Sequence, residues 1–176
     1  IVFNPHLKGL NVTIPYKEAV IPFLDEISPV AKDIGAVNVI QIERNFGNTY
    51  GYKLIGHNTD YIGFKNSIAP LIQLEQHQKA LVLGTGGASK AVCKALDSLG
   101  IKWKYVSRSA KDNQYTYDVL TPKIIAENNI IVNTTPLGTF PNIEEYPQLP
   151  YDSLTPNHLL FDLVYNPIET AFLKKG

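Results

Sequence analysis

The sequence predicts an α/β protein with a parallel β-sheet and a second, smaller α/β domain. The first observation is a glycine-rich turn that joins an apolar run at 81–83 to a segment with helical spacing of apolar residues at 88–99. The second is that apolar, strand-like runs alternate with helix-start signals from there to the end of the chain. Alternating strands and helices form parallel sheets with right-handed crossovers, because each helix packs back onto the sheet it left.

The chain begins with short elements. Residues 10–14 alternate apolar and polar side chains, which predicts a strand that ends in a turn at Pro15. Residues 18–24 predict a short helix that an internal proline bends or shortens. A better-marked helix starts at Ser28-Pro29 and stops at Gly35, since serine caps a helix start, proline suits the first turn and glycine suits the end.

Two apolar-rich runs, 36–42 and 50–55, are separated by a polar stretch at 44–48 that contains a glycine. This pattern predicts two strands joined by a hairpin loop. A helix over 61–68 is expected next, because helical apolar spacing follows a group of capping residues.

Two charged residues stand where one predicted element gives way to the next. Lys17 follows the first predicted strand. Asp60 lies in the first turn of the 61–68 helix, which either Asn58 or Thr59 can cap. The helix dipole favours a negative charge at that position.

The glycine-rich turn, Gly84 to Ser89, has the order of a dinucleotide-binding loop. Residues without side chains let the backbone approach a pyrophosphate, and the free N–H groups at the helix start point at that anion. The third glycine of the usual pattern is replaced by Ser89. The alternative, a glycine-rich turn that serves only to reverse the chain, remains open on this pattern alone.

The rest of the chain continues the alternation. Strands are expected at 102–107, 130–132 and 158–164, a helix after Thr121-Pro122, the start of another at 169–175, and irregular structure over the proline-rich stretch 140–156. In parallel sheets ligands bind beyond the carboxyl ends of the strands. These ends carry Gly84 to Ser89, Ser107 to Ser109, Asn133 to Gly138 and Tyr165.

The end of the second strand of this sheet indicates which dinucleotide binds. NAD-binding domains usually place a carboxylate there, for the ribose hydroxyls, but this chain has Ser107-Arg108-Ser109 and then Lys111. A guanidinium pairs with the 2′-phosphate of NADP, which a carboxylate would repel. We therefore expect NADP. The alternative is an exposed basic loop without a role.

The charge balance argues against a polyanionic partner. Sixteen Lys and Arg residues balance 16 Asp and Glu residues, so no attraction to nucleic acid or to a membrane surface is expected, and a small-molecule substrate is. The single cysteine, Cys93, has no partner for an intrachain disulfide, which favours a reducing, cytoplasmic location. We interpret it as a small apolar side chain on a helix. No apolar run is as long as a membrane span.

Six segments, in this order along the chain, resemble the shikimate dehydrogenase family, which includes enzymes for shikimate and for quinate. They are Asn11 to Lys17, Gly35 to Asn38, Asn58 to Asp60, Gly84 to Ser89, Asn133 to Gly138 and Asp162 to Pro167. The resemblance implies a Rossmann-like NADP-binding domain, residues 61–176, joined to a substrate domain, residues 1–60, with the active site in the cleft between them. It also implies reversible reduction of 3-dehydroshikimate to shikimate by NADPH, on the pathway to chorismate and the aromatic amino acids.

The resemblance assigns roles to individual residues. Lys17 exchanges the proton that accompanies hydride transfer, and Asp60 orients it and contacts a substrate hydroxyl. Further substrate contacts fall on Thr13, Asn38 and Tyr165. The cofactor contacts fall on the glycine loop and the strand ends: Gly84, Thr85, Gly86, Gly87, Ala88, Ser107, Arg108, Ser109, Lys111, Asn133, Thr134, Pro136 and Leu163. No metal ion is expected. The protein is expected to be a monomer or a homodimer.

The family pattern also extends beyond this sequence. Its members open with a strand and a serine motif that holds the substrate carboxylate, and they close with helices that return to the substrate domain. The chain contains no methionine and begins at Ile1 in mid-pattern. We therefore expect it to be a portion of a longer protein that lacks its true N- and C-terminal segments.

Three alternatives remain open. His57, three positions before Asp60, could carry the proton instead of Lys17, because histidine exchanges protons near neutral pH. The protein could use quinate or NAD, against which the basic residues after the second strand argue. It could also be a nucleotide-binding regulator without catalysis, although such a protein would have no use for both Lys17 and Asp60.

Overall fold

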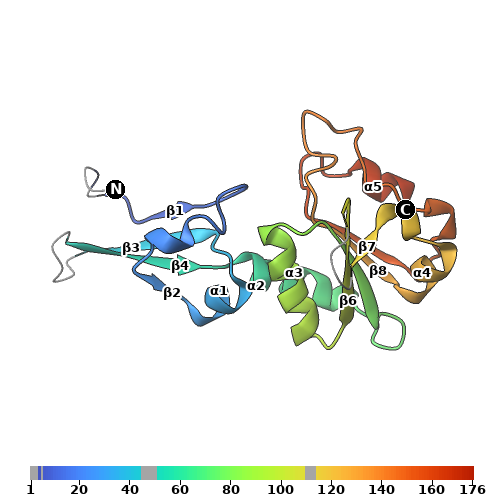
Figure 1. The fold of residues 1–176 in the computed structure, drawn as a ribbon, viewed down its shortest axis with the longest axis horizontal. Coiled ribbons are helices and arrows are strands. Elements are labelled where there is room, and N and C mark those ends of the chain that lie inside the picture. Colours follow the sequence, from blue (N-terminus) through green and yellow to red (C-terminus); the bar gives the residue numbers. More distant parts are fainter. Residues whose placement is uncertain (1–3, 5, 45–50, 110–113) are drawn as a thin grey trace.

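The computed structural model describes residues 4, 6–44, 51–109 and 114–176. It contains two β-sheets, one from the N-terminal third of the chain and one from the remainder (Figure 1). Helices α2 (Asp60–Ile68) and α3 (Gly87–Ser98) lie between the two sheets (Figure 1). The predicted α/β fold with a parallel sheet and a smaller second unit is confirmed.

The N-terminal sheet has four strands in the order β1-β3-β4-β2, formed by β1 (Gly9–Asn11), β3 (Val39–Arg44), β4 (Tyr52–His57) and β2 (Glu26–Ile27). Strands β3 and β4 pair antiparallel along their whole length, which confirms the predicted hairpin. Residues 45–50, which join them, lie outside the described residues. Strand β2 pairs parallel with β4.

Helix α1 (Pro29–Ile34) has the predicted ends. The Ser28 Oγ accepts a hydrogen bond from the Ala31 N–H at 3.3 Å, and Gly35 ends the helix with a left-handed φ of 71°. Ala31 packs with Val37 of the neighbouring turn in the core of the N-terminal sheet. Capping and packing therefore agree on the same boundaries.

Two expectations near Lys17 are wrong. The strand expected over 10–14 ends at Asn11, because the Thr13 carbonyl accepts a hydrogen bond from the Tyr16 N–H at 2.8 Å and turns the chain. The helix expected over 18–24 is reduced to one 3₁₀ turn, Ile21–Phe23. Its central proline lacks the N–H that an α-helix would need there. Lys17 thus lies in a loop between turns.

The second sheet has five strands, and every neighbouring pair in it is parallel. Their order is β7 (Tyr115–Thr116), β6 (Lys102–Ser107), β5 (Lys79–Leu83), β8 (Ile130–Asn133) and β9 (Leu159–Asp162). The central strand β5 is buried on both faces, with residues 80–83 at 0% exposure. The predicted strand 102–107 is confirmed at both ends.

Helices cover both faces of the parallel sheet. Val82 of β5 faces α2 and α3, where Phe64 and Leu96 pack. Leu81 and Leu83 face the other side, which α4 (Pro122–Glu127) and α5 (Ala171–Lys175) cover (Figure 1). No helix in the described ranges is long and apolar enough to cross a membrane.

Several boundaries differ from expectation. Strand β7 is only two residues long and was not predicted, and β9 ends at Asp162 rather than at 164. Helix α5 starts at Ala171 rather than at 169, because the Thr170 side chain caps it. The stretch 140–156 is irregular as predicted, apart from one 3₁₀ turn at Tyr151–Ser153. Further 3₁₀ turns follow α2 (Ala69–Leu71) and β7 (Tyr117–Val119).

Helix α3 also contacts the N-terminal part of the chain. Its Ala91, fully buried, packs against Ala36 and Ile34. Two ion pairs flank this apolar contact, Lys90 with Glu18, at 2.7 Å between Nζ and Oε2, and Lys94 with Asp33. Burial raises the pKa of the Cys93 thiol, on the same helix, to about 12, which agrees with its interpretation as an apolar side chain.

Candidate active site

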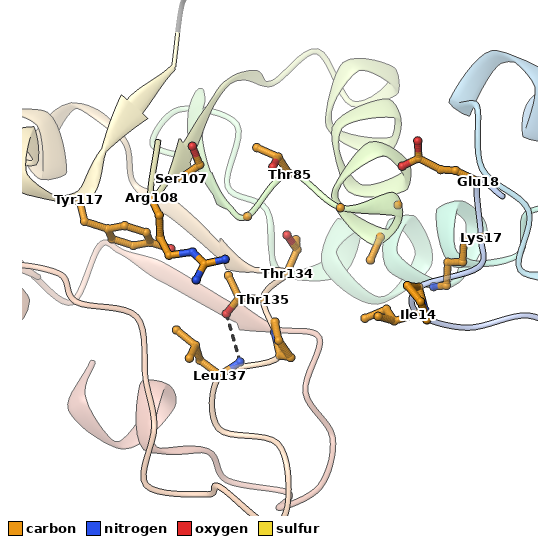
Figure 2. Close-up of a pocket in the computed structure, with 16 residues that line it drawn as sticks. Ile14, Lys17, Glu18, Thr85, Ser107, Arg108, Tyr117, Thr134, Thr135 and Leu137 are labelled. Atoms are coloured by element: carbon orange, nitrogen blue, oxygen red, sulfur yellow. Dashed lines mark hydrogen bonds between the residues drawn. The ribbon is translucent and has the colours of Figure 1, made fainter. Parts of the chain in front are cut away.

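A cavity of about 530 Å³ opens beyond the carboxyl ends of the parallel strands (Figure 2). Its wall combines the glycine loop with the ends of β6 and β8 and with the loop after β1: Ile14, Pro15, Lys17, Glu18, Gly84, Thr85, Gly86, Gly87, Ala88, Ser107, Arg108, Tyr117, Thr134, Thr135, Pro136 and Leu137. Lys17 and Glu18 lie at one end and Arg108 and Tyr117 at the other (Figure 2). Residues far apart in the sequence therefore enclose one elongated space.

The glycine loop has the shape that a dinucleotide requires. Gly84 has a left-handed φ of 98°, and a Cβ there would lie 3.0 Å from the Thr134 Oγ1. At Gly86 an added Cβ would meet nothing within 4 Å, so the backbone borders open space. Ser89 is fully buried, and its Oγ donates to the Gly86 carbonyl at 2.7 Å. Serine in place of the third glycine thus stabilises the loop.

These features fit a dinucleotide phosphate. Gly86 leaves room for close approach at the N-terminus of α3. The Ser89 N–H donates to the Gly86 carbonyl at 3.0 Å, and the N–H groups of Gly87 and Ala88, before it, are those that a helix start offers to an anion. Arg108 is exposed on the same cavity wall and supplies a fixed positive charge. Tyr117 lies beside it (Figure 2). Burial raises the pKa of Tyr117, and the nearby Arg108 charge opposes this shift.

At the other end of the cavity, Lys17, Asp60 and Asn38 form one hydrogen-bonded group. The Lys17 Nζ donates to Asp60 Oδ2 at 2.7 Å, and the Asn38 Nδ2 donates to Asp60 Oδ1 at 2.7 Å. The Lys17 side chain is 14% exposed and that of Asp60 30%. Of the three residues, Lys17 lines the cavity, whereas Asp60 and Asn38 lie off its wall and reach it through Lys17.

Local structure brings the three residues together. Asp60 is the first residue of α2, Asn38 directly precedes β3, and the Lys17 carbonyl accepts from the Val37 N–H at 2.7 Å. The Asn38 Oδ1 accepts from the Thr59 N–H at 2.8 Å, which ties it to the start of α2. A Cβ added at Gly87 would lie 3.2 Å from the Lys17 Cβ, so the glycine loop touches the lysine.

The cavity wall includes many of the residues predicted to bind cofactor and substrate. They are Lys17, Gly84, Thr85, Gly86, Gly87, Ala88, Ser107, Arg108, Thr134 and Pro136. Ser109 is next to the wall, where its carbonyl accepts from the Ser107 Oγ at 2.6 Å. Lys111 lies outside the described residues.

Other predicted residues lie off the wall. Thr13 is exposed and forms the turn before Lys17, and Tyr165 is 87% exposed in the loop after β9. Leu163 packs against the core between the sheet and α2 and α3. Asn133 is fully buried, and its Nδ2 donates to Asp162 Oδ1 at 2.9 Å.

His57 faces elsewhere. Its Nε2 is 3.1 Å from the Gln41 Oε1, and both residues line a second opening, of about 680 Å³, on the N-terminal sheet. It is not on the wall that Lys17 shares with the glycine loop. The geometry therefore favours Lys17 over His57 as the group that exchanges a proton at this cavity.

Six residues of the wall received no individual role in the sequence analysis: Ile14, Pro15, Glu18, Tyr117, Thr135 and Leu137. Four of them adjoin residues that were given a role, and Pro15 lies in the segment Asn11 to Lys17 that carried the family resemblance, so their neighbourhood was the available signal. Tyr117 had none, because it comes from an irregular stretch after a strand of two residues. Among the described residues, no group of three or more His, Cys, Asp or Glu is placed to hold a metal ion.

Comparison with known proteins points in one direction. The family model described as the shikimate dehydrogenase substrate binding domain matches residues 1–40. A shikimate dehydrogenase (NADP(+)) of Clostridium beijerinckii is 44% identical over 177 residues, which cover 97% of this chain and 63% of the relative. The chain thus spans less than two thirds of the length of the curated relatives it matches.

Solved structures agree. Shikimate dehydrogenase 1 from Peptoclostridium difficile matches with a TM-score of 0.79 and 40% identity, over 97% of this chain and 61% of that one. Shikimate 5-dehydrogenase from Thermus thermophilus, in complex with NADP(H) and shikimate, matches with a TM-score of 0.77 and 32% identity, over 97% of this chain and 64% of that one. Over nearly its whole length, the chain is therefore similar in sequence and in fold to shikimate dehydrogenases.

Proposed function

We propose that the protein catalyses the reversible reduction of 3-dehydroshikimate to shikimate with NADPH. The single observation that supports this most strongly is that Lys17, held by Asp60, lines the cavity formed by the glycine loop. A proton-exchanging group and a dinucleotide-binding loop then border the same space, as reduction of a ketone requires. The family relationship supplies the substrate.

We propose that the boundary between the substrate domain and the NADP-binding domain lies at residue 60. Residues 1–60 supply the substrate side, with Thr13, Lys17, Asn38 and Asp60, and residues 61–176 form the NADP-binding domain. The packing supports this boundary, because Phe64 and Ile68 of α2 belong to the core of the five-stranded sheet. Asp60, the first residue of the same helix, is the last residue of the substrate side and contacts Lys17 there.

The cofactor residues act by position and charge. NADPH, when bound, supplies the hydride. Gly86 and the N-terminus of α3 bind the pyrophosphate, since the backbone borders open space and the helix start favours an anion. Ser107 and Arg108 bind the 2′-phosphate by donating hydrogen bonds to it. Thr134 and Pro136 bound the cavity on the side of β8.

Lys17 provides the proton that balances the hydride. Negative charge develops on the carbonyl oxygen during reduction, and the Lys17 ammonium gives that oxygen a proton. In the reverse direction the neutral amine accepts it. Asp60 holds the Lys17 Nζ with Oδ2, and Asn38 holds the other carboxylate oxygen, so the pair keeps one orientation. Tyr165, exposed in the loop after β9, is available to a substrate in the cleft.

The wider setting that we propose is a small-molecule enzyme of the cytoplasm, active as a monomer or homodimer. A reducing compartment is supported by the state of Cys93, whose side chain is buried without a disulfide partner. The equal numbers of acidic and basic residues give no reason to expect a nucleic acid partner.

The test is an activity assay on the protein expressed from its complete coding sequence. Shikimate or quinate is mixed with NADP or NAD, and the absorbance of the reduced nicotinamide is followed. We expect turnover to be fastest with shikimate and NADP. A preference for quinate and NAD would show that the protein is a quinate dehydrogenase instead. Binding of NADP without oxidation of either polyol would favour a regulator without catalysis.

Replacement of Lys17 tests the mechanism. Lys17→Ala should lower kcat by about 10²- to 10⁴-fold, the usual contribution of a positioned acid or base, and should leave the Kd for NADPH within about twofold, since one contact is small beside the whole cofactor interface. His57→Ala is the matched control and should keep near-normal kcat, because His57 faces the other opening. The reverse result, an active Lys17→Ala and an inactive His57→Ala, would refute the assignment.

A further inference from the structure

We propose that Asp162 is a positioning residue that shapes the wall of the nucleotide cavity by tying the ends of β8 and β9 together. The inference rests on the proposed function, because its importance depends on what the cavity binds. Neither Asp162 nor its partners Asn133 and Thr170 lines the cavity. Their effect on a bound nucleotide must therefore pass through the loop that they hold.

The Asp162 carboxylate accepts hydrogen bonds from three separate segments. Oδ1 accepts from the Asn133 Nδ2 and from the Val164 N–H, each at 2.9 Å. Oδ2 accepts from the Thr170 Oγ1 at 2.6 Å. The donors belong to the last residue of β8, the segment after β9 and the cap of α5. One side chain thus connects three separate segments of the chain: the end of β8, the residues after β9 and the start of α5.

Asn133 passes this anchoring on to the cavity wall. Its Oδ1 accepts from the Thr135 N–H at 3.0 Å and from the Thr135 Oγ1 at 2.7 Å. The Thr135 Oγ1 in turn accepts from the Leu137 N–H at 3.3 Å, a bond drawn in Figure 2. Thr135 and Leu137 both line the cavity. A continuous series of hydrogen bonds therefore runs from Asp162 to the wall.

The same loop touches the glycine loop. A Cβ added at Gly84 would lie 3.1 Å from the Thr135 Cγ2, and the Thr134 Oγ1 donates to the Leu83 carbonyl at 2.6 Å. A shift of the loop after β8 would therefore reach the turn on which the pyrophosphate is expected. This gives Asp162 a route to the phosphate-binding end of the cavity.

The chemistry of Asp162 argues against a role in packing alone. Burial raises the pKa of this carboxyl, and its bonds to Thr170, Val164 and Asn133 only partly oppose that shift. A charged group at such a place costs free energy that an apolar side chain would not. Asn133, at 0% exposure, is likewise a buried polar group whose hydrogen bonds go to the loop rather than to the cavity. Both residues are thus explained by the geometry they impose.

The proposal is tested by the Kd for NADPH of four single variants and one double variant of the protein expressed from its complete coding sequence. Asp162→Ala and Asn133→Ala each remove the link to the loop and should raise the Kd about tenfold, the effect of losing a charge-assisted hydrogen bond. The double variant should also be about tenfold weaker, because both changes break one series of bonds. Asp162→Asn keeps an oxygen for Asn133 and Val164 and should stay within about threefold of the wild type.

Thr170→Val is the matched control. It removes the donor to Oδ2 and the cap of α5, and so lowers the thermal midpoint, but leaves the Oδ1 bonds to the loop intact. Its Kd for NADPH should equal that of the wild type. A folded Asp162→Ala with wild-type Kd, additive losses in the double variant, or a Kd that rises in Thr170→Val would overturn the proposal.

Amide hydrogen exchange of residues 134–138 separates this proposal from the proposed function. If the wild type binds no NADPH, the proposed function fails, but the positioning role still predicts faster exchange in Asn133→Ala and Asp162→Ala than in Thr170→Val. Should Asp162→Ala not fold, Asn133→Ala gives the same readout. Equal exchange in Asn133→Ala and Thr170→Val would refute the role of Asp162.

Discussion

The Asp60 carboxylate divides its two oxygens between two donors. Oδ2 accepts from Lys17 and Oδ1 from Asn38, both at 2.7 Å. The carboxylate cannot rotate without losing a charge-assisted hydrogen bond, so the Lys17 ammonium keeps one position relative to the cavity. At this scale the site depends on a few contacts that a single methyl group or charge can change.

One such contact joins Gly87 to Lys17. In Gly87→Ala the new Cβ would lie 3.2 Å from the Lys17 Cβ, closer than an ordinary contact. Because a displacement of about 1 Å costs about 10²-fold when geometry matters, we expect kcat to fall about 10- to 100-fold while the Kd for NADPH changes little. Steady-state kinetics with a separate binding titration measure the two effects.

Gly86→Ala is the matched control for this change. Its Cβ meets no protein atom within 4 Å, and Gly86 lines the cavity where the cofactor is expected. It should raise the Kd for NADPH with a smaller effect on kcat. If both variants lowered kcat equally and left the Kd alone, the contact between Gly87 and Lys17 would not be the cause.

Arg108 supplies the second prediction at this scale. Arg108→Gln removes the positive charge on the cavity wall and should raise the Kd for NADPH about 10- to 100-fold, as expected for hydrogen bonds to a charged group. The Kd for NADH, which lacks the 2′-phosphate, should stay within about twofold. Lys123→Gln removes an exposed charge from α4 and controls for net charge. An equal loss for both nucleotides would contradict the assignment.

At the scale of elements, helix α3 performs two tasks. Its N-terminus faces the cavity, and its side packs against the N-terminal part of the chain through the fully buried Ala91. Two ion pairs flank that contact, but their side chains are 34% to 59% exposed. Exposed pairs contribute little free energy, so the apolar contact should be the stronger link between the two sheets.

Urea unfolding of two variants tests this ranking. Ala91→Leu forces extra volume between Ala36 and Ile34, and overpacking of this kind lowers the free energy of unfolding by about 1–3 kcal/mol. Lys90→Gln breaks the ion pair with Glu18 and should cost less than about 1 kcal/mol. If Lys90→Gln proved the more damaging variant, the ion pairs would be the main link.

At the scale of the whole molecule, Asp162 makes stability depend on pH. Burial raises its pKa above the ordinary value of 3.8, so the folded protein binds a proton there more tightly than the unfolded chain does. The contribution of this carboxyl to stability is therefore largest below the unfolded-chain pKa and falls as pH rises through the folded one. Asp162→Asn carries no titrating group and should lack this contribution.

The measurement is the free energy of unfolding of both forms from pH 3 upward. The stability of the wild type relative to Asp162→Asn should decrease as pH rises above the ordinary value of 3.8 and then level off. Asp152→Asn, at an exposed position, controls for the loss of one negative charge. A difference that grew with pH in favour of the wild type would contradict the raised pKa.

Local signals were sufficient for much of the fold. The ends of α1 follow from Ser28 and Gly35, and β6 follows from its aromatic and β-branched residues, because caps and strand propensities act within short stretches of the chain. Strand β7 was missed, since two residues carry no periodicity. The strand expected over 10–14 was too long, because a turn closed by the Thr13 carbonyl outweighed its alternating pattern.

The candidate site was predictable only in part. The glycine loop and Arg108 are marked by motif and position, and the structure puts them on one wall. Tyr117 carries no motif, and the buried Asn133 is hydrogen-bonded to Asp162, 29 positions away. A residue that contacts a ligand and a residue that positions such a contact look alike in a sequence. What distinguishes them is burial, which only the folded structure shows.

By itself, the sequence determined the parallel sheet, the glycine turn with its helix, and the charges at the strand ends, because these follow from periodicity, capping and residue type over short stretches. The contact of Lys17 with Asp60, across 43 positions, was expected from the family resemblance and not from a local pattern, and the tertiary structure shows the hydrogen bond. The tertiary structure alone decided that His57 faces another opening. It also decided that Asp162 anchors the wall rather than forming part of it. Such contacts depend on which segments the packed core brings together. No local sequence pattern encodes which distant residues will meet.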